Sequence, residues 1–530
     1  MLIKSLLFVV FVFLSACSSK HINTTEGTVV SKKYSHASDA LYYLADDNVS
    51  AHYPQTGFYP LEHNYDAFSA RIGLIEKATK TLDLQYFIYA KDETSIAITQ
   101  RLLDAANRGV KIRVLIDDLL EGNDDKIIAS LARHPNVEIK LFNPTHFRKL
   151  LGWVQLALNV DTLGRRMHNK LFIADNSAVI LGGRNIENIY FAVDNERIFI
   201  DNDILAIGPL AAEASNSFET YWNSKISVPI ETLIEDEKLY TLQEVQKEIN
   251  KLVKEYETSA YVQDVLKRDF SHYMIMNSIP LIYGDAELYY DIPTKITASE
   301  EDTKTHLSEH LIPIVESAKK SLIIINPYFM PNKEMMKGIE KLLDKGVKIT
   351  VLTNSLATND AIAVYGAYAP YQRKLIKMGV KLYELSPYSF EYIYKNQTYR
   401  KGKIPRSSLH AKTMIIDDKI FIIGSANLDP RSIKLNTEVV AVIHSEELAK
   451  IEKEIFHKVI QLKNVYEVGL EKRAPQQCIA TCIPQEDTQV IWKTQRDGKT
   501  IIYHNNDADA GFFRRLISNI SRWIPLEKYL

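Results

Sequence analysis

The stretch MHNKLFIADNSAVILGGRN, residues 167–185, contains a histidine, a lysine and an aspartate at H-x-K-x4-D spacing, followed by a Gly-Gly turn. Read with period two, its apolar residues predict two short buried strands. His168 and Lys170 alternate onto one face of the first strand, and the turn then presents Asn185. A face that carries an imidazole and an ammonium group is suited to meet a phosphate.

The same layout returns in the second half of the chain as LHAKTMIIDDKIFIIGSAN. A single copy would be compatible with a buried β-hairpin that carries a stray histidine. Two copies with the same glycine and asparagine sequel are not expected by chance. The candidate site residues of the two copies are His168, Lys170, Asp175 and Asn185, and His410, Lys412, Asp417, Ser425 and Asn427.

Strands and helices alternate around each copy. IEKATKTLDLQYFIYA and SIAITQRLLDAANRGVKIRVLID predict helix, strand, helix and strand, with Gly109 closing the second helix. VESAKKSLIIINPYFM and MMKGIEKLLDKGVKITVLTN repeat this unit, with Gly346 in the equivalent place. The chain is therefore predicted to be an internal duplication with an α/β fold, two mixed or parallel β-sheets flanked by helices. One motif per half suggests a pseudo-two-fold axis that brings both histidines to one cleft.

The paired motifs resemble the two HKD motifs of the phospholipase D superfamily. TNSLATNDAIAVYGAYAPYQRKLIKMGVKLYEL before the second motif, ANLDPRSIKLNTE after it and the closing WIPLEKYL are similar to the bacterial cardiolipin synthase C type of phospholipase D lipoprotein. The likeness covers most of the chain from about residue 40 onward. It implies a duplicated phospholipase D fold, with the active site at the interface of the two halves.

The resemblance also implies the chemistry, which is phosphodiester transfer without a metal or other cofactor. His168 is then the nucleophile that forms a phosphohistidine, while His410 protonates the departing alcohol and later deprotonates the acceptor. Two lysines take the role of a metal ion. The groups that hold the phosphate and its developing charge are Lys170, Lys412, Asn185, Asn427 and Ser425.

The family places an acidic residue behind each histidine, where it orients the ring through the far nitrogen. Comparison of FIDNDILAIG with LNTEVVAVIH assigns this role to Asp203 and Glu438, with Asp201 as the alternative to Asp203. The spacing from histidine to carboxylate differs between the two halves. The first assignment is therefore less determined by the sequence than the second.

Three further residues belong to the motifs. Asp175 and Asp417 define them, but they follow a strand, where a carboxylate more often braces a turn than contacts a substrate. Arg184 stands in the first Gly-Gly turn, beside the position that corresponds to Ser425 in the second copy. It either replaces a hydroxyl contact or points outward.

The N-terminus MLIKSLLFVVFVFLSACSSK has a charged start and an apolar run too short to remain across a bilayer, which indicates a signal peptide. LSAC resembles a bacterial lipobox, so residues 1–17 are predicted to be a lipoprotein signal with lipidation at Cys17. An ordinary secretory signal or a short anchor is the alternative. Ser18 in place of aspartate favours the periplasmic face of the outer membrane.

The other boundaries follow composition and the repeat. Residues 18–55 predict a flexible tether, 56–225 the first half, 226–305 a connector with helical and strand parts, 306–470 the second half and 471–530 a C-terminal extension. Cys478 and Cys482 in QQCIATCIPQ form a poor zinc pattern. Export favours a disulfide between them, and two free buried thiols are the alternative.

Two segments mix apolar and basic side chains. FRKLLGWVQLALN, with Trp153, precedes the first motif, and GFFRRLISNISRWIPL, with Phe512 and Trp523, lies near the C-terminus. Each is either a helix of the core or an element that faces a membrane, where basic residues beside interfacial aromatic rings suit anionic lipids.

Composition limits the classes of partner. The 530 residues, 46% hydrophobic and 25% charged, are sufficient for two cores, and a net charge of −2 argues against a nucleic-acid partner. We therefore predict a phosphatidyltransferase that acts on membrane phospholipids, phosphatidylglycerol and phosphatidylethanolamine, at a membrane surface and together with an accessory protein. The alternative is hydrolysis of phospholipids to phosphatidic acid. A nuclease of the superfamily and a non-catalytic envelope protein are less favoured, since neither motif lacks a member.

Overall fold

The computed structural model describes residues 39–45, 49–118, 125–144, 165–193, 196–233, 239–257, 259–299, 303, 306–393, 405–472, 488–504 and 508–521. Four predictions lie outside these residues: the signal peptide with Cys17, the segment 147–159 with Trp153, the Cys478–Cys482 pair, and Trp523.

The first half is a mixed β-sheet. Three parallel strands, β2, β3 and β4, continue through β2 into the antiparallel series β5, β6, β8 and β1, while β9 pairs antiparallel with β4. The two strands predicted within the first motif are β5 and β6. The bounds are β1 Thr56–Leu61, β2 Thr81–Tyr86, β3 Lys111–Asp117, β4 Val137–Phe142, β5 Leu171–Ala174, β6 Ala178–Gly182, β8 Asp203–Ile207 and β9 Ser227–Pro229.

The second half repeats this sheet strand for strand. β11, β12 and β13 are parallel, β15, β16, β17 and β10 follow antiparallel beyond β11, and β18 pairs with β13 before the added hairpin β19–β20. The predicted duplicated α/β fold is thus confirmed. The bounds are β10 Ile282–Tyr290, β11 Ser321–Ile325, β12 Lys348–Asn354, β13 Lys381–Leu385, β15 Thr413–Ile416, β16 Ile420–Gly424, β17 Val439–His444, β18 Val465–Lys472, β19 Thr488–Arg496 and β20 Lys499–His504.

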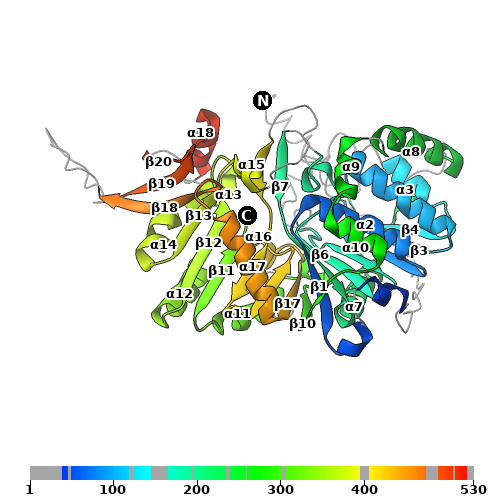
Figure 1. Ribbon diagram of the computed structural model, residues 1–530, viewed down its shortest axis with the longest axis horizontal. Coiled ribbons are helices and arrows are strands. Elements are labelled where there is room, and N and C mark those ends of the chain that lie inside the picture. Colours follow the sequence, from blue (N-terminus) through cyan, green and yellow to red (C-terminus); the bar gives the residue numbers. More distant parts are fainter. Residues whose placement is uncertain are drawn as a thin grey trace, which may run out of the picture. The chain divides into compact units, whose positions relative to one another are not determined.

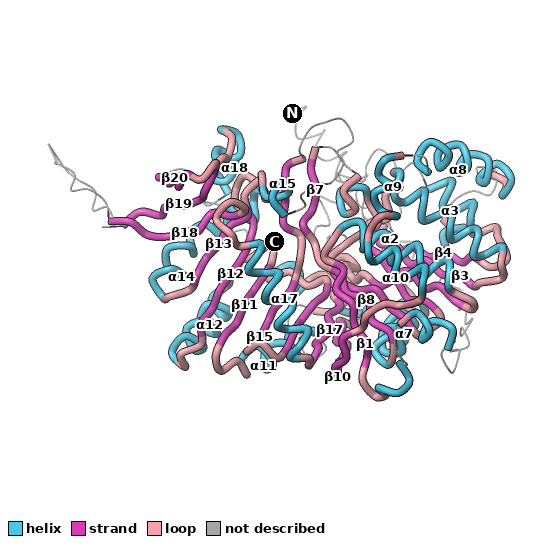
Figure 2. The backbone as a smooth tube through the Cα atoms, in the orientation of Figure 1, coloured by secondary structure: helices cyan, strands magenta, loops and turns pink. Residues whose placement is uncertain are grey.

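Two pairings join the halves. β10 lies between β1 of the first half and β17 of the second, so that the described strands form one continuous sheet (Figures 1 and 2). Separately, β7 (Arg197–Ile200) and β14 (Arg406–Leu409) form a parallel two-stranded sheet with the register Ile200↔Leu409. This small sheet ends directly before Asp201 and His410, and it therefore fixes where these two residues meet.

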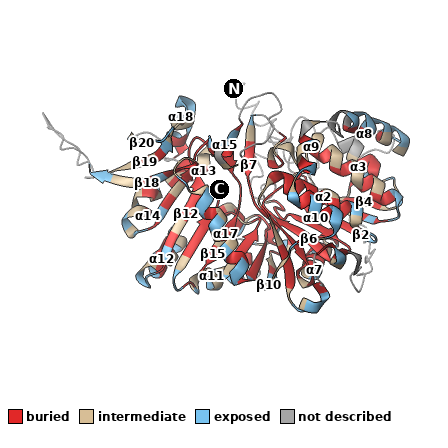
Figure 3. Ribbon diagram, in the orientation of Figure 1, coloured by how far each residue is buried: buried red, intermediate tan, exposed pale blue. Residues whose placement is uncertain are grey.

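Helices cover the sheets, which explains why the central strands β5, β6, β8, β16 and β17 are buried at nearly every position (Figure 3). The α-helices are α2 Asn64–Lys77, α3 Glu93–Asn107, α4 Asp125–Leu131, α7 Pro209–Trp222, α8 Leu242–Glu257, α9 Ala260–Leu266, α10 Asp269–Met276, α11 Leu307–Glu316, α12 Lys333–Asp344, α13 Ile362–Tyr368, α14 Gln372–Met378, α15 Ser389–Ile393, α16 Pro430–Lys434, α17 Glu446–Val459 and α18 Phe512–Ser521. The 3-10 helices include η1 Asp39–Leu44, η2 Val49–His52, η3 Asn188–Tyr190, η4 Ile230–Thr232, η6 Pro293–Ile296 and η7 Ala369–Tyr371.

Local signals account for the ends of the helices that precede the central strands. Asp92 caps α3 by accepting a hydrogen bond from the backbone N–H of Ser95, and the N–H of Asp92 donates in turn to the Ser95 hydroxyl oxygen. Gly109 and Gly346, with φ of 99° and 83°, follow α3 and α12 as predicted. These turns direct the chain back into β3 and β12, beside the strands that lead to the site.

The structure corrects two predicted segments. Residues 39–45 and 49–55, placed in the flexible tether, form η1 and η2, because Leu41, Leu44 and Val49 are buried in the core of the first half. The predicted connector, residues 226–305, is an integral part of the fold. α8 packs on α3 through its buried face, α10 packs on α2, and β10 completes the sheet.

Candidate functional site at the junction of the halves

The two histidines are held by backbone pairing with the opposite half. The N–H of His168 donates to the carbonyl of Thr437 at 2.9 Å, and the N–H of His410 donates to the carbonyl of Ile200 at 2.8 Å. Each histidine therefore lies beside the residue that follows its backbone partner, Glu438 or Asp201. Both imidazoles are buried, with 7% and 5% of the residue exposed.

Each imidazole contacts a carboxylate from the other half. His168 Nδ1 lies 2.9 Å from Glu438 Oε2, and His410 Nδ1 lies 2.7 Å from Asp201 Oδ2. The Nδ1 contact fixes the ring and leaves Nε2 for chemistry. His168 Nε2 has no hydrogen-bond partner among the residues that the structure describes, whereas His410 Nε2 lies 3.5 Å from the hydroxyl of Tyr190.

The assignment of Asp203 as an orienting residue is wrong, and the alternative, Asp201, occupies that place. Asp203 Oδ2 instead accepts a hydrogen bond from Arg71 Nη2 at 2.9 Å, and both side chains are buried. The strand register gives the physical reason. Gly182 pairs with Asp203 in β6–β8, whereas Gly424 pairs with Val440 in β16–β17. The equivalent of Glu438 is therefore the residue two before Asp203.

The two lysines lie against the backbone of their own motifs. Lys170 Nζ donates to the carbonyl of His168 at 2.7 Å, and Lys412 Nζ donates to the carbonyl of His410 at 2.5 Å. Both are nearly fully buried, Lys412 lowers the pKa of Lys170, and each lysine lowers the pKa of the opposite histidine. The structure therefore brings the two motifs into one electrostatic unit, as the duplication predicts.

The predicted phosphate-binding residues have different surroundings. Asn185 is engaged on both sides, since its Oδ1 accepts from the N–H of Ile88 and its Nδ2 donates to the hydroxyl of Tyr190 at 2.8 Å. The Oδ1 of Asn427 is buried without a hydrogen-bond partner among the described residues. Ser425 Oγ donates to Glu438 Oε2 at 2.5 Å. Its hydroxyl therefore supports the carboxylate behind His168, which corrects its expected use as a phosphate ligand.

Asp175 and Asp417 are structural. Asp175 accepts hydrogen bonds from the backbone N–H groups of residues 79, 80 and 81 at the start of β2. Asp417 accepts from those of residues 319, 320 and 321 at the start of β11. Burial raises the pKa of Asp417, but these N–H donors outweigh it and hold that pKa below its ordinary value. Both aspartates therefore brace the chain before a central strand and do not take a catalytic role, in agreement with the interpretation that the sequence favours.

The unusual first turn is explained by Asp201. A side chain at Gly183 would bring its Cβ within 2.0 Å of Asp201 Oδ1, so glycine is required where the carboxylate lies against the turn. Arg184 does not point outward and contacts no open site. It is fully buried, and its guanidinium donates to the carbonyls of Leu61, Glu62 and Asp201, which ties the turn to the end of β1.

Three aromatic side chains that the sequence motifs did not identify surround the histidines. Phe87 meets the ring of His168 edge-on at 5.1 Å, Phe199 stacks on His410 at 4.8 Å, and Tyr190 meets His410 edge-on at 5.1 Å. Tyr190 stands five residues after Asn185. Its counterpart Ser432, five after Asn427, donates to Glu438 Oε1 at 2.6 Å. The sequence signal that could have identified Tyr190 and Ser432 is their shared position, five residues after the asparagine of each motif.

Burial governs the charges of the site. It lowers the pKa of His168, and it lowers the pKa of His410, with help from Lys412, to about 4. It also lowers the pKa of Lys170 to about 7 and that of Lys412 to about 8. Asp201 and Glu438 are held below their ordinary pKa values because the adjacent histidines and lysines outweigh burial. An entering phosphate anion would favour protonation of all four basic groups.

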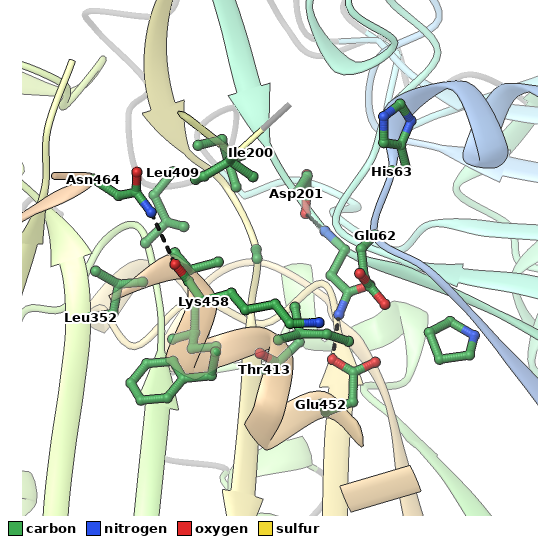
Figure 4. Close-up of a pocket in the computed structure, with 18 of the residues that line it drawn as sticks. Glu62, His63, Ile200, Asp201, Leu352, Leu409, Thr413, Glu452, Lys458 and Asn464 are labelled. Carbon is green, nitrogen blue, oxygen red and sulfur yellow. Dashed lines mark hydrogen bonds between the residues drawn. The ribbon is translucent and has the colours of Figure 1, made fainter. Parts of the chain in front are cut away.

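A cavity of about 610 Å³ lies beside Asp201 (Figure 4). Its lining includes Asp201 and the neighbours of His410 at 409 and 411, but neither histidine. Glu62 and Glu452 face it, and burial raises the pKa of both, that of Glu62 to about 7.

The described residues contain neither a candidate metal site nor a candidate membrane-spanning helix. No group of three or more histidine, cysteine or acidic side chains is placed to hold a metal ion. No helix among them has the length and apolar character needed to cross a membrane.

The family described as "Cardiolipin synthase, PLD-like domain" matches residues 72–222 and 311–460, which together make up more than half of the chain. The chain belongs to this family. Each matched segment contains one of the two site histidines and one of the two carboxylates that contact them. The predicted membership of the phospholipase D superfamily is confirmed. The predicted class of enzyme, a phosphatidyltransferase, is confirmed as well.

Individual relatives agree with the family assignment. Cardiolipin synthase C of Escherichia coli K12 is 34% identical over 90% of this chain and 97% of its own length. An uncharacterized Helicobacter pylori protein is 36% identical over 88% of each chain. The crystal structure of a phosphatidylserine synthase from Haemophilus influenzae aligns with a TM-score of 0.52 and 15% identity, covering 78% of this chain and 90% of that one. This last likeness concerns the fold.

Proposed function

We propose that the chain transfers a phosphatidyl group from phosphatidylglycerol to a hydroxyl group of a second lipid, so that cardiolipin is formed. One observation carries the proposal: two buried imidazoles each use Nδ1 for a carboxylate from the opposite half and have a lysine two residues on. This arrangement supplies a nucleophile, a proton donor and fixed positive charge, which together suffice for phosphodiester transfer. The cardiolipin synthase relatives indicate the lipid class.

In the proposed reaction, His168 Nε2 attacks the phosphorus atom and the bond to the leaving glycerol oxygen breaks. His410 gives its proton to that oxygen, and the phosphatidyl group remains on His168 as a phosphohistidine. The neutral His410 then takes the proton of the acceptor hydroxyl, whose oxygen attacks phosphorus and releases His168. Lys170 and Lys412 stabilise the negative charge on the phosphoryl oxygens in both steps.

Because the pKa of the proton donor His410 is about 4, kcat/KM should already decline above that pH, and we expect a second fall as the pH rises through about 7 to 8. In this range the two lysines, with pKa values of about 7 and 8, lose the charge that attracts the phosphate. The bound anion favours the ammonium forms, so the fall in kcat should come at higher pH than the fall in kcat/KM. Initial rates with monomeric dihexanoyl phosphatidylglycerol, measured as a function of pH, give the pH dependence of both kcat/KM and kcat. A limb near the ordinary lysine value, with thermal unfolding unchanged across the range, would contradict this expectation.

Transfer is expected to exceed hydrolysis, because acceptor hydroxyls are held at high effective concentration on a membrane surface. Purified chain should convert phosphatidylglycerol vesicles to cardiolipin, and addition of phosphatidylethanolamine tests that lipid as a donor. EDTA should have little effect, since the lysines supply the positive charge. Products are followed by thin-layer chromatography, with His168→Ala as the blank. Phosphatidic acid as the main product at all times would assign the chain to the hydrolases instead.

A membrane extract from cells that lack the chain, added to the same vesicles, tests the proposed accessory protein. If the extract raises the rate of the wild-type chain and not that of the His168→Ala blank, a partner acts on this site. An unchanged rate would show that the chain works alone under these conditions.

We further propose that Cys17 carries a lipid and anchors the chain at the periplasmic face of the outer membrane, which the LSAC stretch after the apolar run supports. Cys17→Ser should then accumulate as an unprocessed precursor outside the outer-membrane fraction. Labelled palmitate incorporation and membrane fractionation measure this, with Ser18→Ala as the matched control for the neighbouring position. Wild-type chain that is found unlabelled in the cytosol would refute both the anchor and the export on which the Cys478–Cys482 disulfide depends.

A further inference from the structure

Helix α18 carries its apolar side chains on the face turned away from the protein. Its exposed large apolar residues are Phe512 at 73%, Phe513 at 75%, Leu516 at 45%, Ile517 at 46% and Ile520 at 54%. At about 100° per residue these positions form one stripe. The two buried residues of the helix, Ser518 and Ser521, lie on the opposite side. Of the two alternatives that the sequence leaves open, a helix with its apolar face in the core therefore does not fit α18.

Small residues hold α18 in this orientation. It packs on α13, where Gly366 approaches so closely that a Cβ would come within 2.7 Å of Ser521 Cβ and 2.9 Å of the Ser518 carbonyl. Arg514 Nη1 donates to the carbonyls of Leu356 and Asn359 at 2.9 and 2.7 Å. Helix α18 is thus docked on the protein through its polar face, and this docking leaves the apolar stripe exposed.

Helix α18 is linked to the catalytic site through the loop after β12. The carbonyls that Arg514 binds belong to the loop after β12, and in that loop the carbonyl of Thr358 accepts a hydrogen bond from Ser408 Oγ. The last residue of β12, Asn354, is hydrogen-bonded to both backbone groups of Leu409. Leu409 directly precedes His410, so a single loop connects the exposed apolar stripe with the site.

Positive charge gathers around Arg514. Arg197 and Arg406 stand opposite one another at the outer ends of β7 and β14, the two strands that run inward to Asp201 and His410. Burial lowers the pKa of Arg514 and the charges of Arg197 and Arg406 lower it further, while the single opposing carboxylate, Asp360, has a smaller effect. Such a cluster favours an anionic partner.

We propose that α18 and the arginine cluster, Arg197, Arg406 and Arg514, seat the mouth of the catalytic site on an anionic phospholipid bilayer. The apolar stripe enters the boundary between headgroups and acyl chains, and the guanidinium groups contact lipid phosphates. Phospholipids could then reach the buried histidines along β7 and β14 without leaving the membrane. The inference rests on the proposed phospholipid substrate and adds how that substrate is delivered.

The test compares three forms of the full chain that share the same N-terminus: the wild type, Phe512→Ser/Phe513→Ser, and the control Ile275→Ser/Met276→Ser. The control pair lies at the end of α10 and is similarly exposed, at 62% and 61%. Co-sedimentation is measured with phosphatidylglycerol vesicles and with phosphatidylcholine vesicles, at low and high salt. Turnover is measured on phosphatidylglycerol vesicles and on monomeric dihexanoyl phosphatidylglycerol.

For the Phe512→Ser/Phe513→Ser form we expect binding to phosphatidylglycerol vesicles and turnover of these vesicles to fall at least tenfold. Its turnover of the monomeric substrate should equal that of the wild type. The control form should match the wild type in all measurements. Wild-type binding should weaken with phosphatidylcholine or salt. Equal behaviour of the three forms would overturn the proposal. The proposal would also be overturned if the wild type formed a dimer without lipid and the double substitution disrupted this dimer but left vesicle binding unchanged. The apolar face would then bind a second copy of the chain. Reduced vesicle binding without turnover of either substrate by the wild type would retain the docking surface and refute the proposed function.

Discussion

Replacing His168 or His410 by alanine is expected to abolish phosphatidyl transfer. Each imidazole is committed through Nδ1 to a carboxylate of the opposite half, so the Nε2 atoms must supply the nucleophile and the proton donor. Because these groups act as a unit, each single variant should lose about 10⁴-fold or more in kcat, and the double variant should be little worse than either. Initial rates of cardiolipin formation measure the effect.

The controls separate chemistry from folding. His444→Ala removes an exposed histidine at the end of β17 and should leave the rate unchanged. In His168→Ala, Glu438 keeps the hydroxyl donors Ser425 and Ser432, so the thermal unfolding temperature should change little. In His410→Ala, Asp201 keeps the N–H of Asn202 but loses its ring partner, and a larger drop is expected. Near-normal turnover in either single variant with unaltered unfolding would refute the assignment.

Asp201→Asn and Asp203→Asn should fail in different ways, although the two residues are near neighbours. Asp201→Asn removes the charge that orients His410 and stabilises its protonated form, so kcat should fall roughly 10²- to 10⁴-fold. Asp203→Asn leaves Arg71 buried without its ion partner, which should cost about 3–5 kcal/mol of unfolding free energy. The folded Asp203→Asn protein should keep a kcat within a few-fold of the wild type.

Urea unfolding and active-site-normalised rates distinguish these outcomes. Glu438→Gln is the matched variant for the other histidine and should resemble Asp201→Asn in rate. If Asp203→Asn were stable and inactive while Asp201→Asn remained active, the cross-half pairing seen here would not be the catalytic arrangement.

The sequence carried enough information for the architecture and the core of the site. Short apolar runs located β5 and β6, and the repeated motif located His168, Lys170, His410 and Lys412. These features are local, since each depends on residues within about ten positions of one another. The glycine turns at 109 and 346 belong to the same class, because their backbone conformation follows α3 and α12 directly.

What the sequence could not decide depends on contacts between distant segments. FIDND offers two acidic residues, and only the register of β8 against β6 shows that Asp203 points to Arg71 while Asp201 reaches His410. A carboxylate that serves the histidine of the other half cannot be found from spacing within one half. The same holds for α18, whose amphipathic pattern is compatible with either a buried or an outward apolar face until the Gly366 contact is known.

The exchange of carboxylates has a consequence for how such a chain could arise. Neither half contains a histidine together with the acid that serves it, because Glu438 belongs to His168 and Asp201 to His410. A single-copy ancestor would therefore have been active only as a symmetric pair of identical subunits. Fusion of two gene copies secured that pairing within one polypeptide and released the copies from sequence identity. Gly183 and Ser425, equivalent in the turn but suited to different acids, record that divergence.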